Sequence, residues 1–185
     1  MDNLLMLIGV LDIQGDVSEH INILESLGVK ARKVRKVSDL GELSGIVLPG
    51  GESTVIGSIM AQRGISKGIL DRKLPVMGTC AGLILMSKNV EGKGGLIPLL
   101  DVVIKRNGFG SQKESFETDL LIKDIGKFRG VFIRAPVIMK VESGEVLANY
   151  DNRAVMVSDG KNIGLSFHPE IYGDARIHKY FTDRL

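Results

Sequence analysis

Short apolar runs alternate with more polar segments along the first half of the chain. The runs predict buried strands at Leu4–Leu11, Val29–Val37, Gly45–Leu48 and Pro75–Gly78. The segments between and after these runs predict helices at residues 16–27, from 53 or 54 to 62, and at 81–87. Such alternation is typical of a parallel sheet that is covered by helices on both faces. We therefore expect an α/β fold, a three-layer αβα sandwich.

The first predicted helix carries start and stop signals. Asp16 is a favourable N-cap residue, and Glu19 follows it at the spacing of a capping box. Gly28 comes after the last apolar position and suits the left-handed conformation in which many helices end. His20 and His178 both fall within helical patterns, so we expect them to be packing or surface residues.

Strand-like runs dominate the second half of the chain. They are Leu99–Ile104, Asp119–Ile122, Val131–Ile133, Val137–Glu142, Glu145–Asn149, Ala154–Ser158 and Ile163–Phe167. Because the turns between them are short, we expect antiparallel additions to a mixed, mainly parallel central sheet. The polar segment 106–118 is too long for a hairpin turn and predicts a functional loop. The tail from Asp174 to Arg184 predicts a closing helix.

Composition narrows the class of protein. The length of 185 residues fits a single domain over residues 1–185, and an apolar content of 44% is enough for a full core. The formal net charge is only +2 and no basic face is concentrated in the sequence, so no nucleic-acid partner is expected. The single cysteine excludes an intrachain disulfide framework.

The N-terminal apolar run does not predict a membrane segment. Leu4–Leu11 is far shorter than the ~20 residues that a membrane-spanning helix needs. It follows Met1-Asp2-Asn3, which lacks the basic residues of a signal peptide. We expect a soluble, cytoplasmic protein with no membrane partner.

Cys80 is the leading candidate nucleophile. It lies in Gly78-Thr79-Cys80-Ala81-Gly82, between a predicted strand and a predicted helix. This is the cysteine counterpart of the Gly-x-Ser-x-Gly nucleophile elbow, whose glycines allow a sharp turn. The turn places the sulfur at a helix N-terminus, which favours a thiolate, and directs the N–H of Ala81 toward an oxyanion. A buried structural cysteine is the alternative.

A second motif supplies a base and its anchor. The apolar run 163–167 ends in His168-Pro169-Glu170. Residues two apart in an extended segment point the same way, so the imidazole of His168 and the carboxylate of Glu170 can lie on one side. A catalytic base needs such an anchor to orient it. An ordinary histidine in a surface turn is the alternative. The presence of both this motif and an elbow cysteine favours a Cys-His-Glu triad.

A glycine pair ends the predicted strand Gly45–Leu48. In Pro49-Gly50-Gly51-Glu52, backbone N–H groups can approach a ligand closely, and the N–H of Gly51 can bind the same oxyanion as that of Ala81. An ordinary strand-to-helix turn is the alternative. A phosphate loop is not indicated, because the pattern Gly-x-x-x-x-Gly-Lys-[Ser/Thr] is absent and a carboxylate follows the glycines.

Together these motifs resemble the class I (triad) glutamine amidotransferases, and among them the family of glutaminase subunits of pyridoxal 5′-phosphate synthase. The segments that carry the resemblance are Leu11–Asp16 with Glu19-His20, Pro49–Thr54, Gly78–Leu83, Arg106–Gln112 with Ser115–Glu117, Phe132–Pro136 and Phe167–Glu170. They cover nearly the whole chain in order. The fold that the resemblance implies is flavodoxin-like, of the class I glutaminase type.

The resemblance also implies a role for each candidate residue. Cys80 would be the nucleophile, His168 its general base and Glu170 the residue that orients the base. The oxyanion would bind the N–H groups of Gly51 and Ala81. The residues implied to bind L-glutamine are Gly51, Glu52, Ser53, Arg106, Ile133 and Arg134.

The residue types suit that substrate. Guanidinium groups such as those of Arg106 and Arg134 are well matched to an α-carboxylate, and Glu52 can face an α-ammonium group. Surface ion pairing is the alternative for both arginines. No metal and no cofactor is expected, since the three histidines and the cysteine are widely separated in the sequence.

The family implies a protein partner. Its members pass ammonia to a (β/α)₈-barrel synthase subunit in a hetero-oligomer, which makes pyridoxal 5′-phosphate from ribose 5-phosphate and glyceraldehyde 3-phosphate. Pyridoxal phosphate would then be a product rather than a cofactor of this chain. By family analogy, the helix 16–27 is the better candidate for contact with the synthase. The basic run 30–36 is either an interface patch or an exposed strand edge that lysine protects.

The sequence departs from the family pattern at two places. Ser111 stands where the family usually has arginine, and Asp12-Ile13 stands where alanine-leucine is common. These departures affect the contacts expected with a partner or a phosphate, but not the triad.

Two other classes of protein are alternatives to this family. One alternative is the glutaminase subunit of another ammonia-using synthase. The other is a cysteine hydrolase or stress protein of the same superfold, which often has histidine where this chain has Ala81. A non-catalytic subunit is disfavoured because the triad is complete.

Overall fold

The computed structural model describes residues 6–109 and 115–185. The helices are α1 (Val17–Ser26), α2 (Ser53–Gln62), α3 (Ile65–Asp71), α4 (Ala81–Met86) and α5 (Arg176–Thr182), with a 3-10 helix, η1, at Val37–Leu40. The first strands are β1 (Leu7–Leu11), β2 (Lys30–Val34), β3 (Gly45–Leu48), β4 (Val76–Thr79), β5 (Ser87–Val90), β6 (Lys93–Gly94) and β7 (Leu100–Lys105). The remaining strands are β8 (Ser115–Ile122), β9 (Gly126–Ile133), β10 (Val137–Val141), β11 (Glu145–Tyr150), β12 (Arg153–Ser158) and β13 (Ile163–Leu165).

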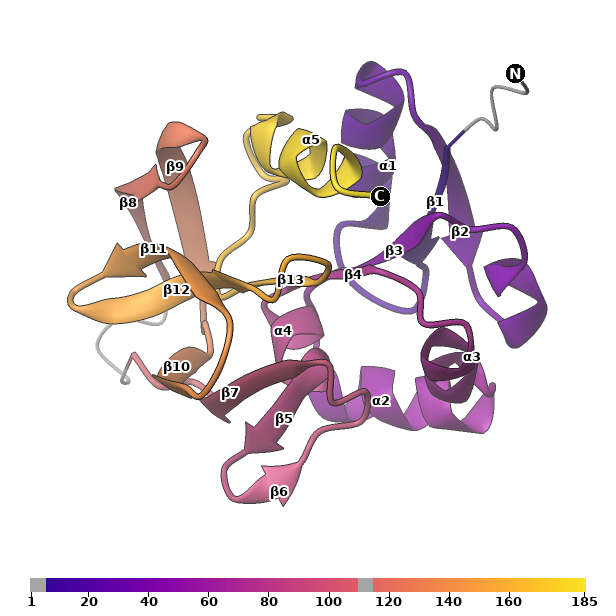
Figure 1. The fold of residues 1–185 in the computed structure, drawn as a ribbon, viewed down its shortest axis with the longest axis horizontal. Helices are drawn as coiled ribbons and strands as arrows, with labels where there is room; N and C mark the ends of the chain where they lie inside the picture. Colours follow the sequence, from indigo (N-terminus) through magenta and orange to yellow (C-terminus); the bar gives the residue numbers. More distant parts are fainter. Residues whose placement is uncertain (1–5, 110–114) are drawn as a thin grey trace.

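A mixed sheet forms the middle layer of the fold. In the part of the chain that the structure describes, seven strands follow one another in the order β11-β12-β13-β4-β3-β1-β2 (Figure 1). Neighbours from β13 to β2 are parallel, whereas β11, β12 and β13 pair in antiparallel fashion. Helices α1 and α5 lie on one face, and α2, α3 and α4 lie on the other. The predicted αβα sandwich with extra antiparallel strands is confirmed.

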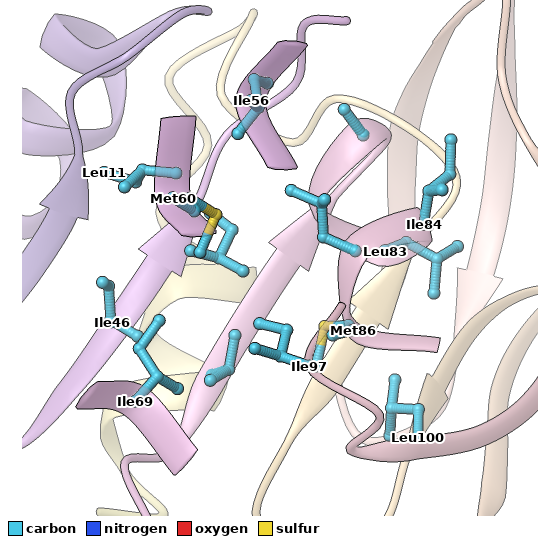
Figure 2. Close-up of a cluster of buried hydrophobic side chains, with 14 of the residues drawn as sticks. Leu11, Ile46, Ile56, Met60, Ile69, Leu83, Ile84, Met86, Ile97 and Leu100 are labelled. Atoms are coloured by element: carbon cyan, nitrogen blue, oxygen red, sulfur yellow. The ribbon is translucent and has the colours of Figure 1, made fainter. Parts of the chain in front are cut away.

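Strand β3 shows how this sheet separates two cores. Its side chains are fully buried on both faces: Ile46 and Leu48 pack with the helices α2, α3 and α4, and Val47 packs with α1 and α5. Figure 2 shows part of the first core, where Ile46 lies close to Ile69 of α3. A strand that is covered on both faces carries consecutive apolar residues, which is why its sequence is recognisable.

The strands of the second half pair differently from the prediction. Among the described residues, β7 and β10 join β5 and β6 in a separate four-stranded sheet, and β8 and β9 form a two-stranded one. Within the former, β5 and β7 are parallel. Strand β13 is parallel to β4 as well as antiparallel to β12. Only β11 and β12 are therefore purely antiparallel additions to the central sheet, because apolar runs predict strands but not their partners.

The predicted loop 106–118 is partly wrong. Residues Ser115–Thr118 belong to β8, which pairs along its whole length with β9. The side chains at the start of β8 are exposed or half-buried, so no apolar run marks this end of the strand. The residues before it, 110–114, lie outside the described part of the chain, and Ser111 is among them.

Local signals near the first helix were only partly informative. Gly28 has a φ of +75° at the end of α1, as predicted. Asp16 precedes the helix, but its side chain makes no capping hydrogen bond, so the predicted capping box is wrong.

The basic run 30–36 contains β2, which lies at the edge of the central sheet. This position supports the interpretation of the basic run as an exposed strand edge. Val37 begins η1 rather than ending a strand.

The N-terminal apolar run is part of this sheet. Its described residues form β1, which pairs with both β2 and β3. Within residues 6–109 and 115–185, no helix combines the length and the apolar character needed to cross a bilayer.

Candidate active site

Cys80 lies at a sharp turn between β4 and α4. Its φ of +51° and ψ of −105° are a strained combination for a residue with a side chain. The neighbouring glycines allow the turn to pack tightly. A β-carbon on Gly82 would lie 2.1 Å from the carbonyl oxygen of Leu48, and one on Gly78 would lie 2.5 Å from the sulfur of Met86. Both positions exclude side chains, as the elbow hypothesis requires.

The central sheet positions His168 relative to Cys80. Leu165 of β13 pairs with Thr79 of β4, and the N–H of Cys80 donates a hydrogen bond to the carbonyl of Leu165 at 2.8 Å. Three residues after Leu165, the N–H of His168 donates a hydrogen bond to the carbonyl of Val131 in β9, also at 2.8 Å. Backbone hydrogen bonds to neighbouring strands therefore position both residues.

The side chains of His168 and Glu170 lie on one side and meet, as predicted. The Nδ1 atom of His168 lies 2.7 Å from Oε1 of Glu170. Glu170 is only 2% exposed, and both Cys80 and His168 are 8% exposed. The backbone of Gly50 lies against the Cε1 edge of the imidazole, since a β-carbon there would come within 2.5 Å of Cε1. The imidazole therefore contacts both a carboxylate and a backbone segment.

This environment favours the charged form of the imidazole. Burial lowers the pKa of His168, but hydrogen bonds to Cys80 and Glu170, together with the charges of these groups, outweigh burial and raise the pKa to about 10. At neutral pH the base is therefore an imidazolium between the sulfur and the carboxylate. A sulfur paired with an imidazolium is the reactive state of a catalytic cysteine.

A cavity of about 290 Å³ opens beside the sulfur. It is lined by Gly51, Glu52, Ser53, Cys80, Ile84, Arg106, Asn107, Ile133, Arg134 and His168. All the residues implied to bind glutamine lie in this lining. The remaining two site residues, Ala81 and Glu170, are buried behind it. Ile84 and Asn107 were not predicted, although Asn107 directly follows a predicted site residue.

The two arginines of the lining differ in their surroundings. The Nη1 atom of Arg106 lies 3.3 Å from Oε2 of Glu91, and its Nε donates to the hydroxyl of Ser53 at 3.4 Å. Arg106 thus combines a surface ion pair with a place in the cavity. Arg134 has a φ of +42° and, within the residues that the structure covers, forms no ion pair. Its guanidinium group is available to an anion.

Glu52 has a structural role at the cavity wall. Its carboxylate accepts hydrogen bonds from the N–H groups of Thr54 and Val55, at 2.9 and 2.8 Å, and so caps α2. These bonds lower the pKa of Glu52 and keep it ionised. Its own N–H donates to Oε1 of Gln14 at 2.9 Å, which connects the glycine loop to the segment after β1. A capping carboxylate retains lone pairs for an ammonium group.

His20 and His178 were expected to be packing or surface residues. Both are fully buried, and His20 also contacts Glu170, while His178 contacts His20. The Nε2 atom of His20 lies 3.6 Å from Oε2 of Glu170, and its Nδ1 lies 2.8 Å from Nε2 of His178. No local pattern indicates this arrangement, because His20 and His178 are 158 residues apart in the chain.

One group of side chains has the spacing of metal ligands. Asp16, His168 and Glu170 each offer a ligand atom, and these atoms lie within 4.8 Å of one another. Two of the three residues are already bonded to each other through Nδ1 and Oε1. An ion at this position would compete with the hydrogen bond that orients the base. The absence of a metal cofactor stays a prediction.

The departure at Asp12 has a local explanation. The carboxylate of Asp12 lies directly after β1 and accepts a hydrogen bond from Nε of Arg35 at 2.6 Å. It also lies 4.0 Å from the ammonium group of Lys33. The acidic residue therefore balances part of the basic run at the edge of the sheet.

Comparisons with known proteins point to one family. Residues 10–185 match the SNO glutamine amidotransferase family. The chain is 45% identical over 181 residues to the pyridoxal 5′-phosphate synthase subunit PdxT of Methanocaldococcus jannaschii, with 96% of this chain and 97% of the relative covered. It is 49% identical over 180 residues to the protein of the same name from Oenococcus oeni, with 95% and 94% covered.

One solved structure agrees with this family, and a more distant one shares only the fold. A crystal structure of a glutamine amidotransferase has a TM-score of 0.91 at 42% identity, with 96% of this chain and 97% of that chain covered. The structure of PurLQS from Thermotoga maritima shares the fold, with a TM-score of 0.70 at 18% identity and coverage of 96% and 98%.

Proposed function

We propose, on the premise that this chain belongs to the SNO glutamine amidotransferase family, that it is the glutaminase subunit of a pyridoxal 5′-phosphate synthase. Two relatives named pyridoxal 5′-phosphate synthase subunit PdxT match it at 45% and 49% identity over nearly their full length. The observation that carries the proposal is the meeting of Cys80, His168 and Glu170 beside a cavity lined by two arginines and a carboxylate.

The reaction begins at the sulfur. The thiolate of Cys80 attacks the side-chain amide carbon of L-glutamine, and the resulting oxyanion binds the N–H groups of Gly51 and Ala81. One such donor typically lowers the barrier by about 3 kcal/mol. His168 gives its proton to the leaving nitrogen, so that ammonia departs and a thioester remains. Water then attacks the thioester while His168 accepts a proton, which releases glutamate.

The cavity residues orient the amino acid. The guanidinium groups of Arg106 and Arg134 bind the α-carboxylate, and the ionised Glu52 faces the α-ammonium group. Charge-assisted hydrogen bonds of this kind are stronger than neutral ones and define a direction of approach. With its α-carbon held at this end, the substrate extends its amide toward Cys80.

Ammonia is the product that a second protein uses. We infer that the partner is a (β/α)₈-barrel synthase subunit in a hetero-oligomer, which combines the ammonia with ribose 5-phosphate and glyceraldehyde 3-phosphate. The word "subunit" in the names of the relatives supports the existence of such a partner. We also infer that the complex is soluble and cytoplasmic, as the sequence predicts.

Substitution of the nucleophile tests the proposal. In the complex with the synthase subunit, Cys80→Ala should abolish pyridoxal phosphate synthesis from glutamine, while synthesis from added ammonium salts persists. Synthesis from glutamine at the wild-type rate would contradict the role of Cys80. If the wild-type chain released glutamate only with a different synthase, the assignment to pyridoxal phosphate synthesis would be wrong.

A further inference from the structure

A pair of buried histidines lies behind the triad carboxylate. His20 belongs to α1 and His178 to α5, two helices on the same face of the sheet (Figure 1). The side chains of His20 and Glu170 are 0% exposed, and His178 is equally buried. The catalytic steps described above use neither histidine.

The second oxygen of Glu170 needs a donor. Oε1 is bonded to His168, but Oε2 is buried and has no hydrogen-bond partner within residues 6–109 and 115–185. A buried carboxylate oxygen without a donor is costly. The Nε2 atom of His20 is also buried and unpartnered among the described residues, and it lies 3.6 Å from this oxygen. A shift of a few tenths of an ångström brings the two atoms to hydrogen-bond distance.

Both histidines are neutral at physiological pH. Burial, with the charges of His178 and His168, places the pKa of His20 well below its usual value. Burial lowers the pKa of His178 to about 4, although Asp174 opposes the shift. Each ring therefore carries one N–H, and the contact between His20 and Glu170 is not an ion pair.

Two tautomeric arrangements satisfy the 2.8 Å contact between the rings. In one, His20 donates from Nδ1 to His178, and the lone pair of its Nε2 faces the carboxylate, which is repulsive. In the other, His178 donates from Nε2 to Nδ1 of His20, and the Nε2–H of His20 faces Oε2 of Glu170. The unpartnered carboxylate oxygen is a hydrogen-bond acceptor, so it favours the second arrangement.

We propose that His20 is a positioning residue for the glutaminase reaction, whose Nε2–H binds the second oxygen of Glu170 in the tautomer that His178 selects. The hydrogen-bonded line then runs from His178 through His20 and Glu170 to His168. It holds the carboxylate in the orientation in which Oε1 stays bonded to the imidazole of His168. The effect on rate rests on the proposed function, whereas the tautomer follows from the buried contacts alone.

The tautomer is directly measurable. The chain has three histidines, so long-range ¹H–¹⁵N spectra of the full-length, histidine-labelled protein contain three imidazole systems. They are assigned with the variants His20→Gln and His178→Gln. At pH 7 we expect neutral Nε2–H tautomers at both His20 and His178. A protonated Nδ1 at His20 would overturn the proposal, whether or not the protein is an active glutaminase.

A matched pair of variants tests the effect on catalysis, with the synthase subunit present. His20→Leu fills a similar volume with an apolar side chain and removes the Nε2–H donor. His20→Gln keeps an N–H near the position of Nε2. We expect His20→Leu to lower kcat about tenfold or more, as for the loss of a hydrogen bond to a charged group. KM for glutamine should hardly change, because Glu170 does not touch the substrate. His20→Gln should recover several-fold of the lost rate.

The pH profile separates positioning from packing. The ionisable groups around His168 are Cys80, Glu170 and Asp16, with His20 and His178 behind Glu170. Without a donor on Oε2, the carboxylate is held less firmly against Nδ1 of His168, and the hydrogen bond that helps to raise the pKa of His168 weakens. The alkaline limb of kcat/KM should therefore move to lower pH in His20→Leu and return in His20→Gln. Equal loss of kcat in both folded variants, or an unshifted alkaline limb, would contradict the proposal. If His20→Leu does not fold, the tautomer of His20 in the wild-type protein still tests the proposal. A wild-type chain without glutaminase activity would count against the proposed function alone.

Discussion

The imidazole of His168 rests on the backbone of Gly50, so closely that a β-carbon at position 50 would lie 2.5 Å from Cε1. The glycine loop is therefore in contact with the base as well as with the substrate cavity. Glycine at this position is required by the ring that packs on it, and not only by the N–H groups that the loop presents.

Replacement of Gly50 by alanine should displace the base. The new methyl group would push the imidazole away from its position between Cys80 and Glu170, and a misplacement of about 1 Å can cost about 100-fold in rate. We expect kcat for glutamine hydrolysis to fall by about this factor, as measured by glutamate release. Gly41→Ala is a matched control, since a β-carbon there lies 3.7 Å from the carbonyl oxygen of Ser38. Undiminished kcat in Gly50→Ala would show that the ring tolerates the methyl group.

The pKa of His168 predicts the alkaline limit of activity. In the proposed reaction, the imidazolium of His168 donates a proton to the leaving group. Its pKa is raised to about 10, so kcat/KM should persist to about that pH. Glu170→Gln removes one of the charges that raise this pKa, and the alkaline limb should then move to lower pH. Glu145→Gln, at a half-exposed carboxylate paired with Lys123, serves as a control. An alkaline limb at the same pH in Glu170→Gln would contradict the assigned cause.

The role of Arg106 can be separated from its surface ion pair. Arg106→Ala should raise KM for glutamine by about 10-fold or more, the usual effect of losing a hydrogen bond to a charged group. Glu91→Gln breaks the ion pair but leaves the guanidinium in the cavity, so its KM should change little, as expected for an exposed pair. Steady-state kinetics at saturating and limiting glutamine give KM for each of the two variants. Equal effects of the two substitutions would mean that Arg106 acts through Glu91.

The elbow glycine Gly82 should be important for stability. A β-carbon there would lie 2.1 Å from the carbonyl oxygen of Leu48, a backbone atom that cannot move aside easily. Gly82→Ala should cost about 1–3 kcal/mol of unfolding free energy, as overpacking usually does. For a chain of this length that lowers Tm by about 2–12 °C. Gly94→Ala, with nothing within 4 Å of its β-carbon, should leave Tm nearly unchanged in the same thermal melts.

Elements with one dominant local signal could be predicted from the sequence. Strand β3 was predicted with its observed bounds because it is apolar on both faces, and α2 because a glycine turn precedes its cap. The elbow at Cys80 and the pair His168 and Glu170 were also predicted, since each is defined within a few residues. The chemistry of the triad is therefore visible locally.

The missed features depend on contacts between distant residues. The exposed start of β8 is a strand because β9 pairs with it, and no periodicity of its own shows this. Strands β5 and β6 form a sheet only together with β7 and β10. The side chain of Asp16, expected to cap α1, lies near His168 and Glu170 instead. His20 and His178 likewise become chemically meaningful only when α1 and α5 meet in space.

The ladder between Leu165 and Thr79 couples catalysis to cooperative unfolding. Separation of the backbones that carry the sulfur and the imidazole requires rupture of hydrogen bonds in the middle of the sheet, away from its edges at β2 and β11. Fraying at those edges leaves the triad assembled, and the amide of Cys80 should exchange with solvent only through global opening. Heat or denaturant should therefore abolish turnover and native structure in a single transition.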